Sequence, residues 1–414
     1  MEPESASALP SYTATRVPSR ETGSPLVDQF SLVQGGLIYR FQAAIHMAMP
    51  DRSGILKRAL LTTLITWFPL LLLSALQGGA LGPQVQIPFL HDFGVNIRFL
   101  IGLPLLVIAE AVIDPKLNRA VRHFTISGLV DSEHLPGFED VILKTNKLRN
   151  RIFPALLILL AAFVPSIWYR ETELLRHGVS SWHNIASPFG GSLSLAGWWF
   201  GFISLPLYRV LLFRWIWIVL LWTVFLRRVA RIDLRCVATH PDGCGGLGFL
   251  AQAQLFFGFI GFAASAVMAG ALGNVIAYEG ASISSLKFLV IAFCVLIVAV
   301  FATPLLALTP KLAMVKRKGV YGYGALGTKY VGDFDAKWIH GHPSDHEQLL
   351  GTADIQSLAD LRNSFSVVEE MRVVLIDRRT LVGLAIPAIL PMLLLIMIAT
   401  PADQIIRAVL KLLL

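Results

Sequence analysis

Long hydrophobic stretches alternate with polar segments along the 414-residue chain. A helix needs about 20 apolar residues to cross the hydrocarbon core of a bilayer. The chain therefore predicts seven membrane-spanning helices: Ala59–Leu76, Ile97–Ile113, Ile152–Tyr169, Trp198–Leu226, Phe249–Ala277, Leu286–Leu308 and Leu381–Thr400. We expect an all-α fold, a polytopic transmembrane helix bundle, and we find no internal repeat in the sequence.

Two of the predicted spans contain features that interrupt a helix. The second stretch is short and carries Gly102, Pro104 and Glu110, so a re-entrant segment is an alternative to a full crossing. The fourth stretch is expected to contain a break near Pro206, because proline cannot donate the backbone hydrogen bond of a regular helix.

The remaining segments fall outside the predicted bundle of spans 1–6, which covers 59–308. Residues 1–30 are polar and rich in Ser, Thr and Pro, which is typical of a disordered tail and unlike a signal peptide. Residues 31–58 predict an interfacial amphipathic segment, with an in-plane helix over Leu37–Met49. Residues 309–380 predict a loop with amphipathic helices at Lys329–Ile339 and Ile355–Val374, and 381–414 predict the last span followed by a short interfacial helix.

Lysine and arginine are distributed unevenly between the two sets of alternate loops. Of the 35 such residues, 27 lie in the N-terminal segment and the second, fourth and sixth loops, and only five lie in the other set. Positively charged loops stay in the cytoplasm, so we expect a cytoplasmic N-terminus and an external C-terminus. The cationic loops that set this orientation also account for the net charge of +8. The sequence contains no basic stripe interleaved with aromatic residues, so it does not indicate nucleic-acid binding.

Charged residues inside spans are costly and mark candidate functional positions. Glu110 and Asp114 are four residues apart and share one face of the second span. Arg209 and Arg214 lie in the fourth span, and by depth Arg214 and Glu110 are able to meet. These four residues indicate either a pathway for an ion or proton or a structural ion pair, and the sequence leaves both interpretations open.

The fourth loop is rich in arginine and glycine. Its arginines precede a glycine-rich turn at the start of the fifth span, where free backbone N–H groups are able to hold an anion or a lipid headgroup. The alternative is a tight turn beside arginines that only set orientation. The candidate contacts are Arg231, Arg235, His240, Asp242, Gly243, Gly245, Gly246 and Gly248. A dinucleotide site is excluded because no strand precedes this G-x-G-x-x-G spacing.

Other patterns carry weaker signals. His340, His342 and His346 are weak metal-ligand candidates in a loop that reads more simply as solvated. We find no catalytic motif and expect no cofactor. The small residues of the fifth span favour close helix packing within the bundle, with a homo-oligomer contact as the alternative; they are Gly261, Ser265, Ala269 and Gly273.

Two motifs resemble a family of uncharacterised bacterial inner-membrane proteins: HPDGCGGLGFL at His240–Leu250 and GTADIQSLADL at Gly351–Leu361. The resemblance implies a bacterial cytoplasmic membrane and no particular activity. From the residues, we expect a channel or transporter for a small solute or ion. The alternative is a membrane-embedded signalling or scaffold protein that docks a cytoplasmic partner through the 309–380 loop.

Overall fold

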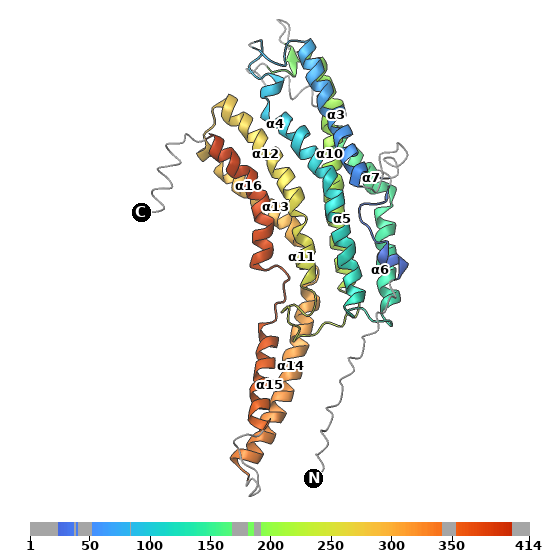
Figure 1. Ribbon diagram of the computed structural model, residues 1–414, viewed down its shortest axis with the longest axis vertical. Helices are drawn as coiled ribbons and strands as arrows, with labels where there is room; N and C mark the ends of the chain where they lie inside the picture. The colour runs from blue at the N-terminus through green and yellow to red at the C-terminus, as the bar shows by residue number, and fades with distance from the viewer. Residues whose placement is uncertain are drawn as a thin grey trace, which may run out of the picture.

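The protein is an elongated helical bundle from which one helical hairpin projects (Figure 1). The computed structural model describes residues 24–36, 39, 52–82, 84–167, 181–185, 192–341 and 353–399. The helices before the fourth span are α1 (Pro25–Asp28), α3 (Arg52–Leu76), α4 (Phe93–Ile97), α5 (Leu103–Ile126), α6 (Leu135–Arg149) and α7 (Ile152–Ile167). The later ones are α9 (Leu195–Trp199), α10 (Leu205–Val229), α11 (Phe249–Leu255), α12 (Gly258–Glu279), α13 (Ile283–Leu306), α14 (Thr309–Phe334), α15 (Ala353–Glu370) and α16 (Arg378–Ala399).

Shorter elements complete the fold. A 3₁₀ turn lies at Phe89–His91, and π-helical turns lie at η2 (Arg98–Gly102), η3 (Phe200–Ser204) and η4 (Asp335–Ile339). The two-residue strands β1 (Asn184–Ile185) and β2 (Ser192–Leu193) pair antiparallel. We call the end of the bundle from which α14 and α15 project the hairpin end (Figure 1).

Within the described residues, six helical segments are long and apolar enough to cross a membrane, and the chain is a multi-pass membrane protein with the expected all-α bundle. A seventh span is present if α6 and α7, which are bent by 41° at their junction, count as one. Helix α7 alone has 16 residues. At 1.5 Å per residue it is about 24 Å long, shorter than the roughly 30 Å hydrocarbon core.

The second span is longer than the sequence indicated. Its helical path runs from Phe93 to Ile126, 34 residues, whereas the predicted span ended at Ile113. A hydropathy pattern places the end of a span where polar residues begin. The helix itself ends only where its backbone hydrogen bonds end, which is further along the chain here. The expected break near Pro206 is the π-helical turn η3, and α10 follows it directly.

An internal repeat, which the sequence did not reveal, relates the second and fourth spans. Helices and turns α9, η3 and α10 begin at 195, 200 and 205, each 102 residues after α4, η2 and α5 at 93, 98 and 103. Each unit starts at a side-chain cap, Asp92 or Ser194, and in each a Leu-Pro pair follows the π-helical turn. The two turns touch: the rings of Phe99 and Phe200 are 6.0 Å apart.

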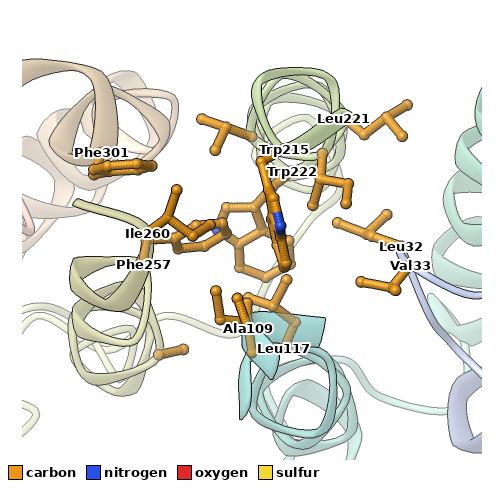
Figure 2. Close-up of a cluster of buried hydrophobic side chains, with 14 of the residues drawn as sticks. Leu32, Val33, Ala109, Leu117, Trp215, Leu221, Trp222, Phe257, Ile260 and Phe301 are labelled. Atoms are coloured by element: carbon orange, nitrogen blue, oxygen red, sulfur yellow. The ribbon is translucent and has the colours of Figure 1, made fainter. Parts of the chain in front are cut away.

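Residues 24–36, which we call the N-terminal strap, pack against α5 and α6 with one set of side chains buried and the other exposed. This differs from the expected disordered tail over 1–30 and interfacial segment over 31–58. Val27, Phe30, Leu32 and Val33 of the strap are at most 4% exposed. Leu32 and Val33 point toward the same core as Trp215 of α10 (Figure 2). An apolar run this short cannot span a membrane. Hydropathy averaged over about 20 residues therefore did not distinguish it from the polar residues around it.

The region predicted as a loop over 309–380 is a helical hairpin. Helix α14 begins at Thr309, twenty residues before the predicted amphipathic helix, and reaches Phe334 before η4. Helix α15 packs against it, with Tyr330 donating to the carbonyl of Asp354 at 3.0 Å. Three expectations lie outside the described residues: the tail before residue 24, nearly all of the in-plane helix over 37–49, and the helix after residue 400.

Candidate functional site

A cluster of buried ion pairs lies where α3, α5 and α10 meet. The carboxylate of Glu110 accepts from Arg58 of α3 through one oxygen and from Arg214 of α10 through the other. All three residues are 6–7% exposed. The structure thus brings Glu110 and Arg214 together, and it adds Arg58, which stands one residue before the span predicted from hydropathy.

The strap contacts both ends of this cluster. Asp114, one turn after Glu110 on α5, accepts from the Ser31 hydroxyl at 2.7 and 2.8 Å and from the backbone N–H groups of Leu32 and Val33. The Val33 carbonyl accepts from Arg214 at 3.0 Å. Two buried acids and two buried bases therefore lie together, and both carboxyl oxygens of each acid have hydrogen-bond partners.

Arg209 does not belong to the cluster. Its guanidinium donates to the Ala162 carbonyl and to the Ser166 hydroxyl of α7, each at 3.3 Å. Five residues turn a helix by about 140° beyond one full turn, so Arg209 and Arg214 face different neighbours. Of the four pathway candidates, the structure therefore groups Glu110, Asp114 and Arg214 and separates Arg209.

A cavity of about 530 Å³ with polar and charged side chains in its walls includes Asp114 in its lining. It lies between the strap and the last turns of α5, and its walls include Asp28, Asn118 and Arg122. Asn118 donates to the Phe30 carbonyl at 2.8 Å, and Arg122 pairs with Asp28 at 2.9 Å, so the strap forms one wall. Glu110 is not among the residues that line this cavity.

The glycine-rich loop is organised around Asp242. Its carboxylate accepts from the N–H groups of Cys244 at 2.7 Å, Gly246 at 3.1 Å and Gly248 at 2.8 Å. Gly243, Gly245 and Gly246 have φ angles between 62° and 93°, a region that favours glycine because a side chain is strained there. The amides predicted to hold a bound anion are therefore occupied by a carboxylate of the same loop.

Asp242 is ionised at neutral pH. Burial by itself raises its pKa, but the three N–H bonds and the His240 ring at 2.9 Å outweigh burial and lower the pKa below its ordinary value. The loop also holds the segment before α16: Arg372 donates its N–H to the Gly243 carbonyl at 2.8 Å and a guanidinium N–H to the Asp242 carbonyl at 3.1 Å. The motif thus fastens the hairpin to the bundle.

The arginines ahead of this loop have separate environments. Arg231 is exposed, whereas Arg235 pairs with Asp131 at 2.9 Å. The backbone N–H and the ring of His134, together with Arg235, lower the pKa of Asp131 below its ordinary value. Asp131, Glu133 and His134 have ligand atoms within 4.8 Å of one another, but Asp131 is already engaged by His134 and Arg235.

The weak metal candidates in the hairpin do not form a site within the described residues. His340 is exposed at the end of η4. His342 and His346 lie outside the described residues.

The four small residues of the fifth span are all buried within the chain. Gly261 lies against Ile297 and Phe301 of α13, and Ser265 donates to the Ala388 carbonyl of α16. Ala269 packs with Met392, and Gly273 lies against Leu395. This stripe packs the bundle, and a subunit contact through it would require α12 to separate from α16.

Sequence reasoning missed a second buried acid network at the opposite end. Asp92 caps α4 and accepts from Trp182 at 3.0 Å and from Asn274 of α12 at 2.7 Å. Its position in a loop of low charge was a usable signal, because a lone acid before a helix is a typical N-cap. Arg58 and Ser31 gave no such signal, since their importance depends on tertiary contacts.

The site therefore brings ionisable groups of opposite sign together inside the bundle, and one of them, Asp114, lines a cavity with polar walls. Comparisons of the chain with protein-family models, with curated proteins and with solved structures found no match.

Proposed function

We propose that this membrane protein is a channel or transporter for a small ion or hydrophilic solute. The observation that carries the proposal is the set of buried ionisable residues on α3, α5 and α10, because one of them, Asp114 of α5, lines a cavity with polar walls. Ionisable residues within spans are expensive and commonly mark ion or proton pathways. The two helix–break–helix units also favour transport, because broken helices often flank transporter sites.

The strap forms one wall of this pathway, and it is bonded to α5 through Asp114 and to α10 through Arg214. Burying its four apolar side chains favours this position by roughly 1.5–3 kcal/mol each, before the cost of ordering the segment is subtracted.

We further propose that the hairpin end faces the cytoplasm of a bacterium and that the C-terminus lies outside. The lysine and arginine asymmetry supports this orientation. Thr328→Cys in the hairpin should react with a membrane-impermeant thiol reagent only in inside-out vesicles. Ser284→Cys, in the turn before α13, should react only from the other side, and the reverse pattern would overturn the orientation.

Flux through purified protein in liposomes tests the proposal. The probes are protons, potassium ions, chloride ions and glycerol, each compared with empty liposomes. Glu110→Gln and Arg214→Gln should abolish the flux that the unmodified protein supports. Arg209→Gln is the matched control, since it removes a charge from the same helix without touching the cluster.

Stability must be measured beside flux, because losing one partner of a buried ion pair costs about 3–5 kcal/mol. Variants that elute as unfolded or aggregated protein are replaced by the double variant Glu110→Gln with Arg214→Gln, which removes opposite charges together. Absence of flux for all four probes, or full flux in the folded double variant, would show that the cluster is structural.

A second candidate function is docking of a partner, in signalling or as a scaffold. The observation that favours it is the hairpin, whose 26-residue helix α14 projects from the bundle (Figure 1). At 1.5 Å per residue this arm is about 39 Å long. If deletions in 340–375 alone give a phenotype while no probe crosses the membrane, docking is the better account.

A further inference from the structure

Asp114 is a buried acid that is bonded only to neutral groups. It is 8% exposed, and no ion pair joins its carboxylate to a lysine, arginine or histidine in the described part of the chain. Its donors are the hydroxyl of Ser31 and the backbone N–H groups of Leu32 and Val33. Glu110, one turn earlier on α5, lies instead between two guanidinium groups. The two buried acids of the cluster therefore have different surroundings.

The groups around Asp114 suit a proton as its ligand. A buried carboxylate with no cation beside it is costly, and such a group commonly becomes neutral by binding a proton. A metal cation needs several oxygen atoms as ligands, whereas the strap presents one O–H and two N–H groups to this carboxylate. The donors thus favour a proton over a metal ion.

The two oxygens of Asp114 are not equally occupied. Oδ1 lies within reach of all three donors, whereas Oδ2 is reached only by the Ser31 hydroxyl, at 2.7 Å. A hydroxyl carries one hydrogen, so it cannot bond fully to both oxygens at once. Oδ2 is therefore able to bind a proton while Oδ1 keeps its bonds to the strap.

The cavity beside the strap leads from Asp114 toward exposed residues. Asp114, Asn118 and Arg122 all line it, and their spacing of four places them on one face of α5. Eight residues at 1.5 Å each separate Asp114 from Arg122 by about 12 Å along the helix. The Arg122 side chain is 50% exposed, and a cavity with polar walls is able to hold water. Water in this cavity would connect the buried carboxyl group with the solvent.

The other ionisable groups near Asp114 either have partners of their own or are exposed. Within the bundle, they bond to one another or to carbonyl groups of the strap, and Lys116 lies over the ring of Phe256. In the cavity walls, they form an exposed ion pair or face the surface. They are Arg58 of α3, Glu110, Lys116, Arg119, Arg122 and His123 of α5, Arg149 of α6, Arg214 of α10 and Asp28 of the strap.

We propose that Asp114 is a proton-binding site and that the proton is the ion that this protein moves or couples to. Oδ2 takes a proton from a hydronium ion in the cavity, which leaves a water molecule, and it later returns the proton to water. Glu110 stays bonded to its two arginines throughout. Proton binding follows from the surroundings of Asp114 alone, whereas movement of the proton across the membrane rests on the channel or transporter proposal.

Labelling with dicyclohexylcarbodiimide tests proton binding without any measurement of flux. This reagent adds to a protonated carboxyl group, whose proton passes to a nitrogen of the carbodiimide, and mass spectrometry of peptides locates the adduct. In the full chain in liposomes, Asp114 should be labelled at least about tenfold faster than Glu110, because a proton on Glu110 would leave two buried arginines without their anion. The rate at Asp114 should fall by up to about tenfold for each pH unit as the pH rises, because fewer carboxyl groups carry a proton.

A pH gradient across the liposome membrane then tests whether the bound proton moves. A pH-sensitive dye trapped inside should report proton movement through the parent chain, and Asp114→Asn should reduce it at least tenfold. Asp140→Asn is the matched control, because Asp140 is an exposed acid of α6 that pairs with Lys144 on the same helix. Labelling needs no variant, so it decides whether Asp114 binds a proton even if Asp114→Asn does not fold.

Three results would overturn the proposal. Absence of label on Asp114, or equal labelling of Asp114 and Glu110, would mean that Asp114 is no selective proton site. Protection of Asp114 by sodium or potassium ions at constant pH would identify a metal cation as the ligand. Unchanged proton movement in folded Asp114→Asn would place the pathway elsewhere. Failure of the transport proposal alone would look different: Asp114 would be labelled with the expected pH dependence, while no probe crosses the membrane in the parent.

Discussion

Replacing Asp242 by asparagine should release the glycine-rich loop from the segment before α16. The carboxylate holds three backbone N–H groups, two on one oxygen and one on the other. Asparagine keeps one acceptor oxygen, but its amide N–H₂ replaces the other and faces the N–H of Gly248. The substitution therefore weakens two charge-assisted bonds and leaves one donor without an acceptor.

The expected loss is about 3–5 kcal/mol of local stability. Hydrogen bonds to a charged group contribute about 1.5–3 kcal/mol and neutral ones about 0.5–1.5, so weakening two of them costs about 2 kcal/mol. An unsatisfied buried donor adds about 1–3 kcal/mol. The effect should stay local because loops open in cooperative units smaller than the whole fold.

Cys244 reports the opening without any added label, because its side chain is 1% exposed. In a background with Cys236→Ser and Cys294→Ser, its reaction with a thiol reagent measures how often the loop opens. A loss of 3 kcal/mol predicts a rate more than about 100-fold higher, since 1.4 kcal/mol is a factor of ten. Asp233→Asn is the control, because Asp233 is 81% exposed and its pair with Lys311 should change the rate only slightly. Equal rates in Asp242→Asn and the parent, or equal acceleration by both variants, would refute the reasoning.

Other variants test the remaining contacts. Phe30→Ala should destabilise the chain by about 3–5 kcal/mol in thermal unfolding, because the ring is 2% exposed; a loss below 1 kcal/mol would mean that the strap is dispensable. Asp242→Gly should let added phosphate slow Cys244 labelling by occupying the vacated amides, whereas phosphate should not affect the parent. Hydrogen bonds lower the pKa values of Asp242 and Asp377, so the docking stability is present above about pH 4 and lost as pH falls through the lowered values. The protection factors of the loop amides, which are exchange rates corrected for their intrinsic pH dependence, should therefore fall below that pH and stay constant between pH 5 and 7.

The spanning helices could be predicted because hydropathy is summed over about 20 residues. A single polar residue within a span therefore changes the sum only slightly. The pairing of Glu110 with Arg214 was suggested by depth, since both spans run in the same direction. Span ends were less predictable. The second helix continues past Asp114 because its backbone bonding does not depend on lipid, and Lys311 to Phe334 form a helix despite five glycines.

The contacts that define the site depend on residues distant in sequence. Ser31 and Asp114 are separated by 83 positions, and Arg58 and Glu110 by 52. Nothing local marks Phe-Ser-Leu-Val as a core segment, because three apolar residues within four positions are common in tails. The sequence predicted Asp242 as a contact of a bound anion. In the structure its own carboxylate is the anion that the loop amides bind, and this could not be predicted without the turns at Gly243, Gly245 and Gly246.

Two ion pairs join the base of the hairpin to the loop that follows α5, the helix that carries Glu110, which raises the question of whether the hairpin and the buried charge cluster are coupled. Lys311 holds Asp233, and two residues later Arg235 holds Asp131 beyond the end of α5. Contiguity alone does not establish coupling. A double-mutant cycle does: Lys311→Met and Glu110→Gln should have additive effects on unfolding free energy if the hairpin is an independent platform. A coupling free energy above about 0.5 kcal/mol would contradict independence and would mean that a change at the base of the hairpin is able to bias the ion pairs within the membrane.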